Sequence, residues 1–333
     1  MSNATSLAIA VHRADQPGEP GEPGAEGEHQ IRVGTASWTD KTLIACGRFY
    51  PKGATKAEAR LRFYAAQFPI VEVDSSYYAM PTPATAQLWA ERTPPGFVMN
   101  VKAFRLFTGH QTAARVLHAD LRPALGSLAD AASFFYGDVP AELRSELWLR
   151  FRDALLPLRA AGKLGLVHFQ FPPWVVCDAA GRAQVAHCAE RMAGFDLSAE
   201  FRHQTWFGAR DQASTLAFLR ELALAHTVVD GPQGFANSVP AVWEATHPRY
   251  ALVRLHGRNA RTWNIRGATS ASDRFNYDYP ETELGELAPR IERLALTALQ
   301  THVIFNNNME DQGQRNARSL IGLLAGRGRR PAG

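Results

Sequence analysis

The residues best suited to chemistry lie where short apolar segments of the sequence end. Alternate residues of a β-strand face opposite ways, so the polar members of each segment share one face. Opposite charges gathered on a buried face must be paired or solvated, because isolated buried charge is costly. The pattern therefore predicts either a functional pocket or an interior lattice of salt bridges. The residues on this face are Glu72, Asp74, Asn100, Lys102, His168, Gln170, Glu200, Arg202, Arg254, His256, His302 and Asn306.

Three of the ionisable residues are predicted to be catalytic. Glu200, in AEFRHQTW, is the best candidate for a base, because Arg202 two residues later would hold it ionised. A structural ion pair is the alternative. Asp230 precedes GPQG and could be functional or could cap the turn. Lys102 could bind a substrate anion, form a plain salt bridge, or form a Schiff base if its pKa were lowered.

Further polar and aromatic residues are predicted to bind a substrate. Arg254, with His256, could clamp a phosphate or carboxylate through bidentate hydrogen bonds. Aromatic side chains near the strand ends suit stacking on sugars or bases, and equally suit a hydrophobic collar. The predicted set comprises Asp74, Gln170, Arg202, Arg254, His256, Asn306 and Asn307, with Trp38, Tyr77, Tyr78, Trp174 and Trp206 at the rim.

No cofactor is indicated by the sequence, although a divalent metal is compatible with it. The oxygen ligands Glu72, Asp74, Glu200 and Asp230, with His168 or His256, could hold such an ion. No HxH or HExxH spacing supports this hypothesis. Phosphate-binding and dinucleotide-binding glycine motifs and a GxSxG nucleophile motif are absent. These absences disfavour NTPases, Rossmann dehydrogenases and serine hydrolases.

The elements that must position these residues alternate between strands and helices. Strands are expected at 31–37, 70–75, 97–103, 165–171, 197–203, 226–230, 250–256 and 301–307, and helices at 55–68, 83–92, 140–161, 182–193, 211–224, 283–299 and 315–324. This order predicts a single (β/α)8 TIM-type barrel over 30–325, with its site at the carboxyl ends of the strands. Residues 104–164 are expected to add a helical insertion or lid.

Composition bounds the remaining expectations. The 333 residues are 46% hydrophobic and 20% charged, with a formal net charge of +4, and hold no apolar run near the ~18 residues of a membrane span. Residues 1–29 are acidic and rich in proline and glycine, which predicts a disordered leader, and 326–333 form a basic tail. Cys46, Cys177 and Cys188 form no CxxC pair, which predicts a reduced, cytoplasmic protein.

Several peptides together resemble the domain-of-unknown-function family 72, also called YecE-like. They are GTASW, FYPKG, VEVDSSYY, RTPPGFVMNVKA, FQFPPW, AEFRHQTW, VRLHGR and FNNN followed by RNARSL. The resemblance implies a TIM barrel and membership of the longer branch, which carries TGHQT and the 104–164 insertion. The family has no settled reaction, and it often has Asn at the position of Asp74, so that carboxylate is not marked as indispensable.

Three functional hypotheses follow. The first is an enzyme, of hydrolase or lyase type, acting on a small polar, anionic or polyhydroxylated substrate, which could be phosphorylated. The second is a metal-assisted phosphodiesterase, nuclease or nucleic-acid-binding barrel, suggested by the basic body and the aromatic residues. The third is a non-catalytic ligand-binding protein. No membrane partner is expected.

Overall fold

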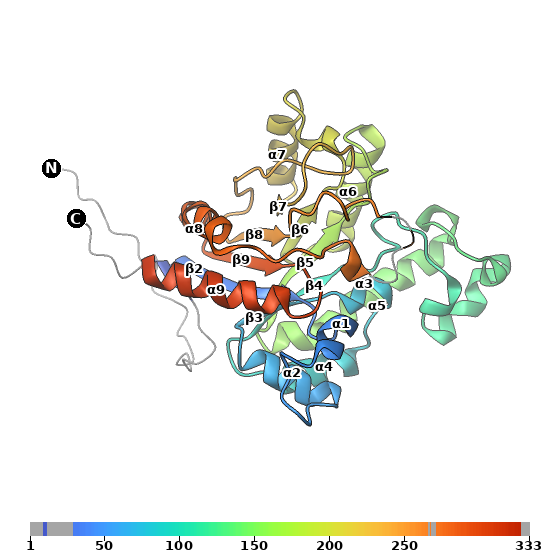
Figure 1. Ribbon diagram of the computed structural model, residues 1–333. Helices are drawn as coiled ribbons and strands as arrows, with labels where there is room; N and C mark the ends of the chain where they lie inside the picture. The colour runs from blue at the N-terminus through green and yellow to red at the C-terminus, as the bar shows by residue number, and fades with distance from the viewer. Residues whose placement is uncertain (1–8, 12–28, 266, 268–270, 328–333) are drawn as a thin grey trace.

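Eight parallel strands close into a barrel in the computed structural model, which describes residues 9–11, 29–265, 267 and 271–327 (Figure 1). Each strand pairs with the next along the chain, and β2 pairs with β9 to complete the ring. This arrangement confirms the predicted TIM-type barrel. The strands are β2 (His29–Ala36), β3 (Ile70–Val73), β4 (Val98–Lys102), β5 (Leu164–Gln170), β6 (Leu197–Glu200), β7 (Leu224–Asp230), β8 (Tyr250–Leu255) and β9 (Gln300–Phe305).

Helices follow seven of the eight barrel strands within the described residues. They are α2 (Ala57–Ala65), α4 (Pro83–Glu91), α5 (Ala141–Ala160), α6 (Ala179–Arg191), α7 (Gln212–Glu221), α8 (Glu281–Ala295) and α9 (Gln312–Arg327). Two short helices, α1 (Lys41–Cys46) and α3 (Ser75–Tyr78), were not expected from the sequence. The link from β7 to β8, residues 231–249, contains no helix, and its chain covers the outer side of β7.

The leader contains one element that the sequence did not predict. Strand β1 (Ile9–Val11) pairs in parallel with the start of β2, with Ile9 opposite His29 and Val11 opposite Ile31. The rest of the predicted disordered leader, 1–8 and 12–28, lies outside the described residues, as does 328–333 of the basic tail. The predictions for those residues therefore stay predictions.

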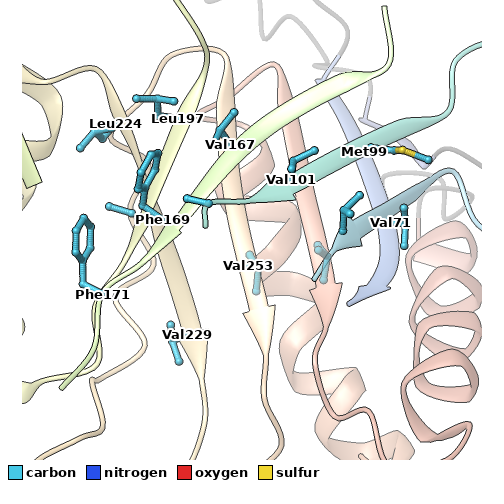
Figure 2. Packing of buried hydrophobic residues seen from close by; sticks show 14 of the residues in the cluster. Val71, Met99, Val101, Val167, Phe169, Phe171, Leu197, Leu224, Val229 and Val253 are labelled. Atoms are coloured by element: carbon cyan, nitrogen blue, oxygen red, sulfur yellow. The ribbon is translucent and has the colours of Figure 1, made fainter. Parts of the chain in front are cut away.

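Apolar side chains on one face of the strands form the main core beneath the helices. Val71, Val101, Val167 and Val253 project to this side and are fully buried (Figure 2). The opposite face looks into the barrel, where a smaller apolar cluster occupies part of the interior. It comprises Ala36, Ile70, Val98, Leu166, Ala225, Tyr250, Leu252 and Ile304. Glu72, Glu200 and Arg254 share that inner face and meet inside the barrel.

The insertion between β4 and β5 divides into two parts. Its second part is α5, which packs against α4 in the helical ring. Its first part consists of loops and the 3-10 helices η1 (Ala114–Val116), η2 (Ala119–Asp130) and η3 (Tyr136–Asp138), and it projects from the barrel on the right of Figure 1. Gly109 and His110 of this part contact Trp174 and Tyr77. The insertion thus reaches the carboxyl end of the barrel, while its role as a lid stays a prediction.

Two further observations concern membrane-spanning helices and disulfide bonds. Among the helices of the described chain, none combines the length and the apolar character needed to cross a bilayer. Cys46, Cys177 and Cys188 are all free thiols.

Candidate functional site

Arg254 lies at the centre of the barrel and joins two carboxylates. Its Nη2 donates to Oε1 of Glu72 at 2.6 Å, and its Nη1 donates to Oε2 of Glu200 at 2.6 Å. All three side chains are fully buried. The strand pattern placed these charges on one face correctly, and the deep part of the barrel is a lattice of salt bridges.

Each carboxylate oxygen of Glu200 accepts a hydrogen bond from an arginine. Oε1 accepts from Nε of Arg202 and lies 3.3 Å from Nε2 of His256, while Oε2 accepts from Arg254 and lies 3.5 Å from Nε2 of His168. A carboxylate that is buried and fully engaged has no free oxygen to take a proton from a substrate. The geometry therefore does not favour Glu200 as a catalytic base and gives it a positioning role.

His256 connects this lattice to Asn306. Nδ1 of His256 lies 2.8 Å from Nδ2 of Asn306, whose Oδ1 accepts from Arg254 at 3.3 Å. Nε2 of His256 lies 3.1 Å from Nη2 of Arg202, which can only donate, and 3.3 Å from Oε1 of Glu200. One chain of hydrogen bonds thus runs from Asn306 through His256 and Arg202 to Glu200.

Within the lattice, Glu200 is ionised, whereas His168 and His256 are neutral. Burial acts to raise the pKa of Glu200, but the charges of Arg202 and Arg254 outweigh it and hold that pKa well below its usual range. Burial lowers the pKa of His256 to about 3, with Arg202 adding to the effect. Burial likewise lowers the pKa of His168, whose Nδ1 lies 3.0 Å from Oγ of Ser198.

A more accessible layer lies above the lattice at the carboxyl ends of the strands. Nζ of Lys102 donates to Oδ1 of Asp74 at 2.9 Å and lies 4.4 Å from the ring centre of Tyr77. Burial acts to raise the pKa of Asp74, but Lys102 and Arg254 bring it below its usual value. Nη2 of Arg202 donates to Gln170 at 3.3 Å. Lys102 therefore forms a salt bridge with Asp74, one of the three alternatives that the sequence left open.

Sequence reasoning missed two residues in this layer, Arg105 and His110. The guanidinium of Arg105 lies 5.3 Å from the ring centre of Tyr77, and its buried Nε has no hydrogen-bond partner. Burial, and then the charges of Arg105, Lys102 and Arg202, lower the pKa of His110 to about 3. His110 also contacts Tyr77 and Trp174 at 5.3 and 5.5 Å between ring centres. The signal available was their position in AFRLFTGH, directly after β4.

Asp230 does not join the central cluster. It lies in register with Leu255, on the face of the sheet opposite Arg254. It accepts from Nε and Nη2 of Arg258 and from the hydroxyl of Tyr279 at 2.7 Å. The hydroxyl of Tyr279 in turn accepts from the amide of Gly257. The prediction of a catalytic Asp230 beside Glu200 and Lys102 is corrected, because this carboxylate holds the loop that follows β8.

Three predicted binding residues also lie elsewhere. Nδ2 of Asn307 donates to the carbonyl of Tyr277 and to Asn316 of α9, so it anchors the scaffold. Trp206 is fully buried and stacks on Phe201 with ring centres 3.9 Å apart, so it offers no face at the rim. Trp38 is also buried and packs edge-on against Trp89. The rim predictions for Trp38 and Trp206 are wrong, since both side chains turn under the helices.

Trp174 and Tyr78 do reach the surface. Trp174 is 58% exposed, and its Nε1 donates to the carbonyl of Gly109 at 3.0 Å. Tyr78 packs edge-on against Tyr77. Together with Tyr77 and His110, they place aromatic rings next to Lys102 and Arg105.

The acidic residues proposed as metal ligands are paired with cations instead. Glu72 and Glu200 bind Arg254, Asp74 binds Lys102, and Asp230 binds Arg258. Over the described part of the chain, no three or more His, Cys, Asp and Glu side chains are grouped so that they could share a metal ion. The donor set does not fit the metal-assisted hypothesis.

Comparisons with known proteins agree with the fold. A family model described as "Protein of unknown function DUF72" matches residues 32–332. The UPF0759 protein YunF of Bacillus subtilis is 31% identical over 296 residues, which cover 88% of this chain and 94% of YunF. A DUF72 family protein from Thermotoga maritima is similar in structure, with a TM-score of 0.69, 26% identity, and coverage of 89% of this chain and 100% of the other. One from Enterococcus faecalis has a TM-score of 0.70 at 24% identity, covering 89% and 95%.

Proposed function

Because this chain belongs to the DUF72 family, whose function is unknown, we propose from its own side chains that it is an enzyme acting on a small anionic substrate. The substrate would lie at the carboxyl ends of the strands, beside Tyr77, with its negative group against Lys102 and Arg105. The observation that most supports this proposal is the excess of positive charge beside Tyr77. Nε of Arg105 has no hydrogen-bond partner within the described part of the chain, while Lys102 is bound to Asp74. Burial is the main cause of the lowered pKa of His110, and the charges of Arg105, Lys102 and Arg202 lower it further.

The lattice beneath supports this proposal by fixing the floor of the site. Glu200 holds Arg202, and Arg202 reaches Gln170 in the accessible layer. A cation held rigidly by a buried carboxylate needs little reorganisation when it meets an anion. Gln170 and Asn306 add amide groups that suit hydroxyl or carbonyl oxygens of a substrate.

The reaction class that fits is one in which negative charge develops on oxygen. Fixed cations stabilise such charge in the transition state of a hydrolase or lyase. Asp74, ionised beside Lys102, would orient the ammonium group and would accept a proton only when Lys102 turns to the substrate. The exposed face of Trp174 would stack on the uncharged part of the substrate.

A binding and turnover screen tests this proposal. Purified protein at low salt would be titrated with phosphate monoesters, sugar phosphates and small carboxylates, with binding followed by calorimetry and turnover by product analysis. We expect one class to bind and react, with at least about tenfold weaker binding in Lys102→Met and Arg105→Met, since each loses a charge-assisted contact.

Arg220→Met is the matched control, because Arg220 pairs with Glu244 on the outer surface and should not affect binding. Binding without turnover would favour the non-catalytic alternative. Equal affinity in the wild type and both site variants would refute the proposed site.

A further inference from the structure

A cavity lies at the amino end of the barrel, opposite the proposed substrate site. It has a volume of about 640 Å³ and is bounded by the first residues of several strands and the loops that precede them. Arg32 of β2, Tyr250 of β8 and Gln300 of β9 line it from inside the barrel. The proposed substrate site uses none of these residues.

Arg32 is the unusual member of this lining. It is only 8% exposed, and the one hydrogen bond of its side chain to another described residue runs from Nη1 to the neutral amide oxygen of Gln300 at 3.1 Å. Its buried Nε has no partner. Across the described residues, no Asp or Glu forms a salt bridge with Arg32. Burial lowers its pKa, as expected for a guanidinium without a counter-charge. A buried, unpaired arginine is costly unless an anion joins it.

The rest of the lining adds positive charge. Arg159 and Arg249 also border the cavity, against the single acid Asp196. Asp196 lies 3.5 Å from Nη1 of Arg249 and 3.8 Å from Nε2 of His247, so it is already shared. Arg159 stacks on Phe195 at 5.2 Å and leaves its charge free for the cavity. The cavity thus holds two more positive than negative side chains.

We infer that this amino-end cavity is an anion-binding site for a phosphate or phosphate-monoester dianion, with Arg32 as its innermost ligand. The guanidinium would donate through its free Nη to one oxygen of the anion, and a small rotation of the side chain would bring the buried Nε to a second oxygen, in the bidentate geometry that arginine favours. Arg249 and Arg159 at the mouth would neutralise the remaining charge. The loops after α5 and α6 bring Gly162 and Gly194 to this mouth, where they leave room for the ligand.

Titration of the full-length protein with inorganic phosphate tests this inference. Thermal unfolding would be followed in a buffer without other oxyanions, against sodium chloride of equal ionic strength. We expect phosphate to raise the melting temperature of the wild type and of Lys102→Met, whose change lies at the other end of the barrel. In Arg32→Met we expect at least about tenfold weaker phosphate binding. Without phosphate, this variant should melt at or above the wild-type temperature, because it loses an unpaired buried charge.

The variants also separate this inference from the proposed function. A phosphate response that disappears in Lys102→Met and persists in Arg32→Met would assign phosphate to the carboxyl end and overturn the inference. A wild type with no response beyond that to sodium chloride would overturn it as well. If Arg32→Met does not fold, Arg249→Ala, whose side chain is largely exposed, carries the test through at least about threefold weaker binding. Unchanged binding in that variant refutes the site.

Discussion

Arg254 should be the residue on which the stability of the barrel interior depends most. Replacing it with Met keeps much of the side-chain volume and removes the charge between Glu72 and Glu200. Glu200 keeps Arg202 as a partner, but Glu72 loses the only cation bound to it among the described residues. At an effective dielectric constant near 20, one such charge pair contributes about 4 kcal/mol of attraction. Breaking a buried pair typically costs about 3–5 kcal/mol, which is the loss we expect for Arg254→Met.

A double-mutant cycle isolates the cause. Glu72→Gln removes the charge that Arg254→Met leaves uncompensated, so the double variant should be no less stable than Arg254→Met alone. We expect a coupling energy of about 2 kcal/mol or more between the two positions. Urea unfolding followed by tryptophan fluorescence and circular dichroism measures all four proteins.

Arg220→Met again serves as the control for removing a positive charge. Arg220 and Glu244 are both 49% exposed, and exposed pairs contribute about 0–1 kcal/mol. A loss in Arg254→Met no greater than in Arg220→Met, or a loss in the double variant equal to the sum of the single losses, would refute a strong pairing of Arg254 with Glu72. Either result would mean that solvent or relaxation already screens the interior charges.

Three further outcomes can be checked together. The free energy of unfolding, measured by guanidinium titration, should fall as the pH is lowered from 6.5 to about 4. In that range the histidines of the unfolded chain bind protons while the buried histidines of the folded protein stay neutral, and each such histidine lowers the stability by about 1.4 kcal/mol per pH unit. A stability that does not change with pH would contradict their burial. Gly165→Ala should lower the free energy of unfolding in urea by about 1–3 kcal/mol, since its Cβ would lie 2.5 Å from Oδ1 of Asn100. The control Gly285→Ala in α8 meets open space and should be neutral or stabilising by up to about 1 kcal/mol. Equal effects of the two substitutions would show that the barrel interior can rearrange to accept the methyl group. The thiol of Cys188, whose pKa burial raises, should resist iodoacetamide in the native protein and react once unfolded, and fast native labelling would refute its burial. The pH prediction concerns four histidines whose pKa values burial lowers to about 3 or about 4, namely His110, His226, His256 and His302.

The sequence predicted the barrel and much of its inner polar face, because apolar and polar residues alternate along most of the strands and so show which side chains share a face. Glu72 and Arg254 each stand between buried apolar residues, and the structure brings them together at 2.6 Å. The strand ending in Asp230 reads LAHTVVD and has no clean alternation near its end, so its parity could not be assigned. Asp230 consequently seemed to join Glu200, although it faces the other way.

The residues that were misplaced or missed lie mostly in loops. Trp206 follows β6 closely, but the chain turns into η4 (Gln204–Phe207) and sends the indole under the helices onto Phe201. Strand parity stops applying once the strand ends, so a loop residue cannot be placed by counting. Arg105 was missed for the same reason. Arg32 was overlooked because polar residues at the amino ends of barrel strands are not where function is usually sought.

The link between β7 and β8 covers the outer side of β7 and fills the core there, as a helix does behind the other strands. Thr246 accepts from the amide of His226 at 2.7 Å and donates to the carbonyl of Leu224 at 2.6 Å, while Val239 and Val242 are buried in the outer core. Insertions are ordinarily tolerated best in connecting segments. Here an added residue between Val242 and Thr246 would shift these partners out of place, so this stretch should tolerate changes in length as poorly as a buried strand does.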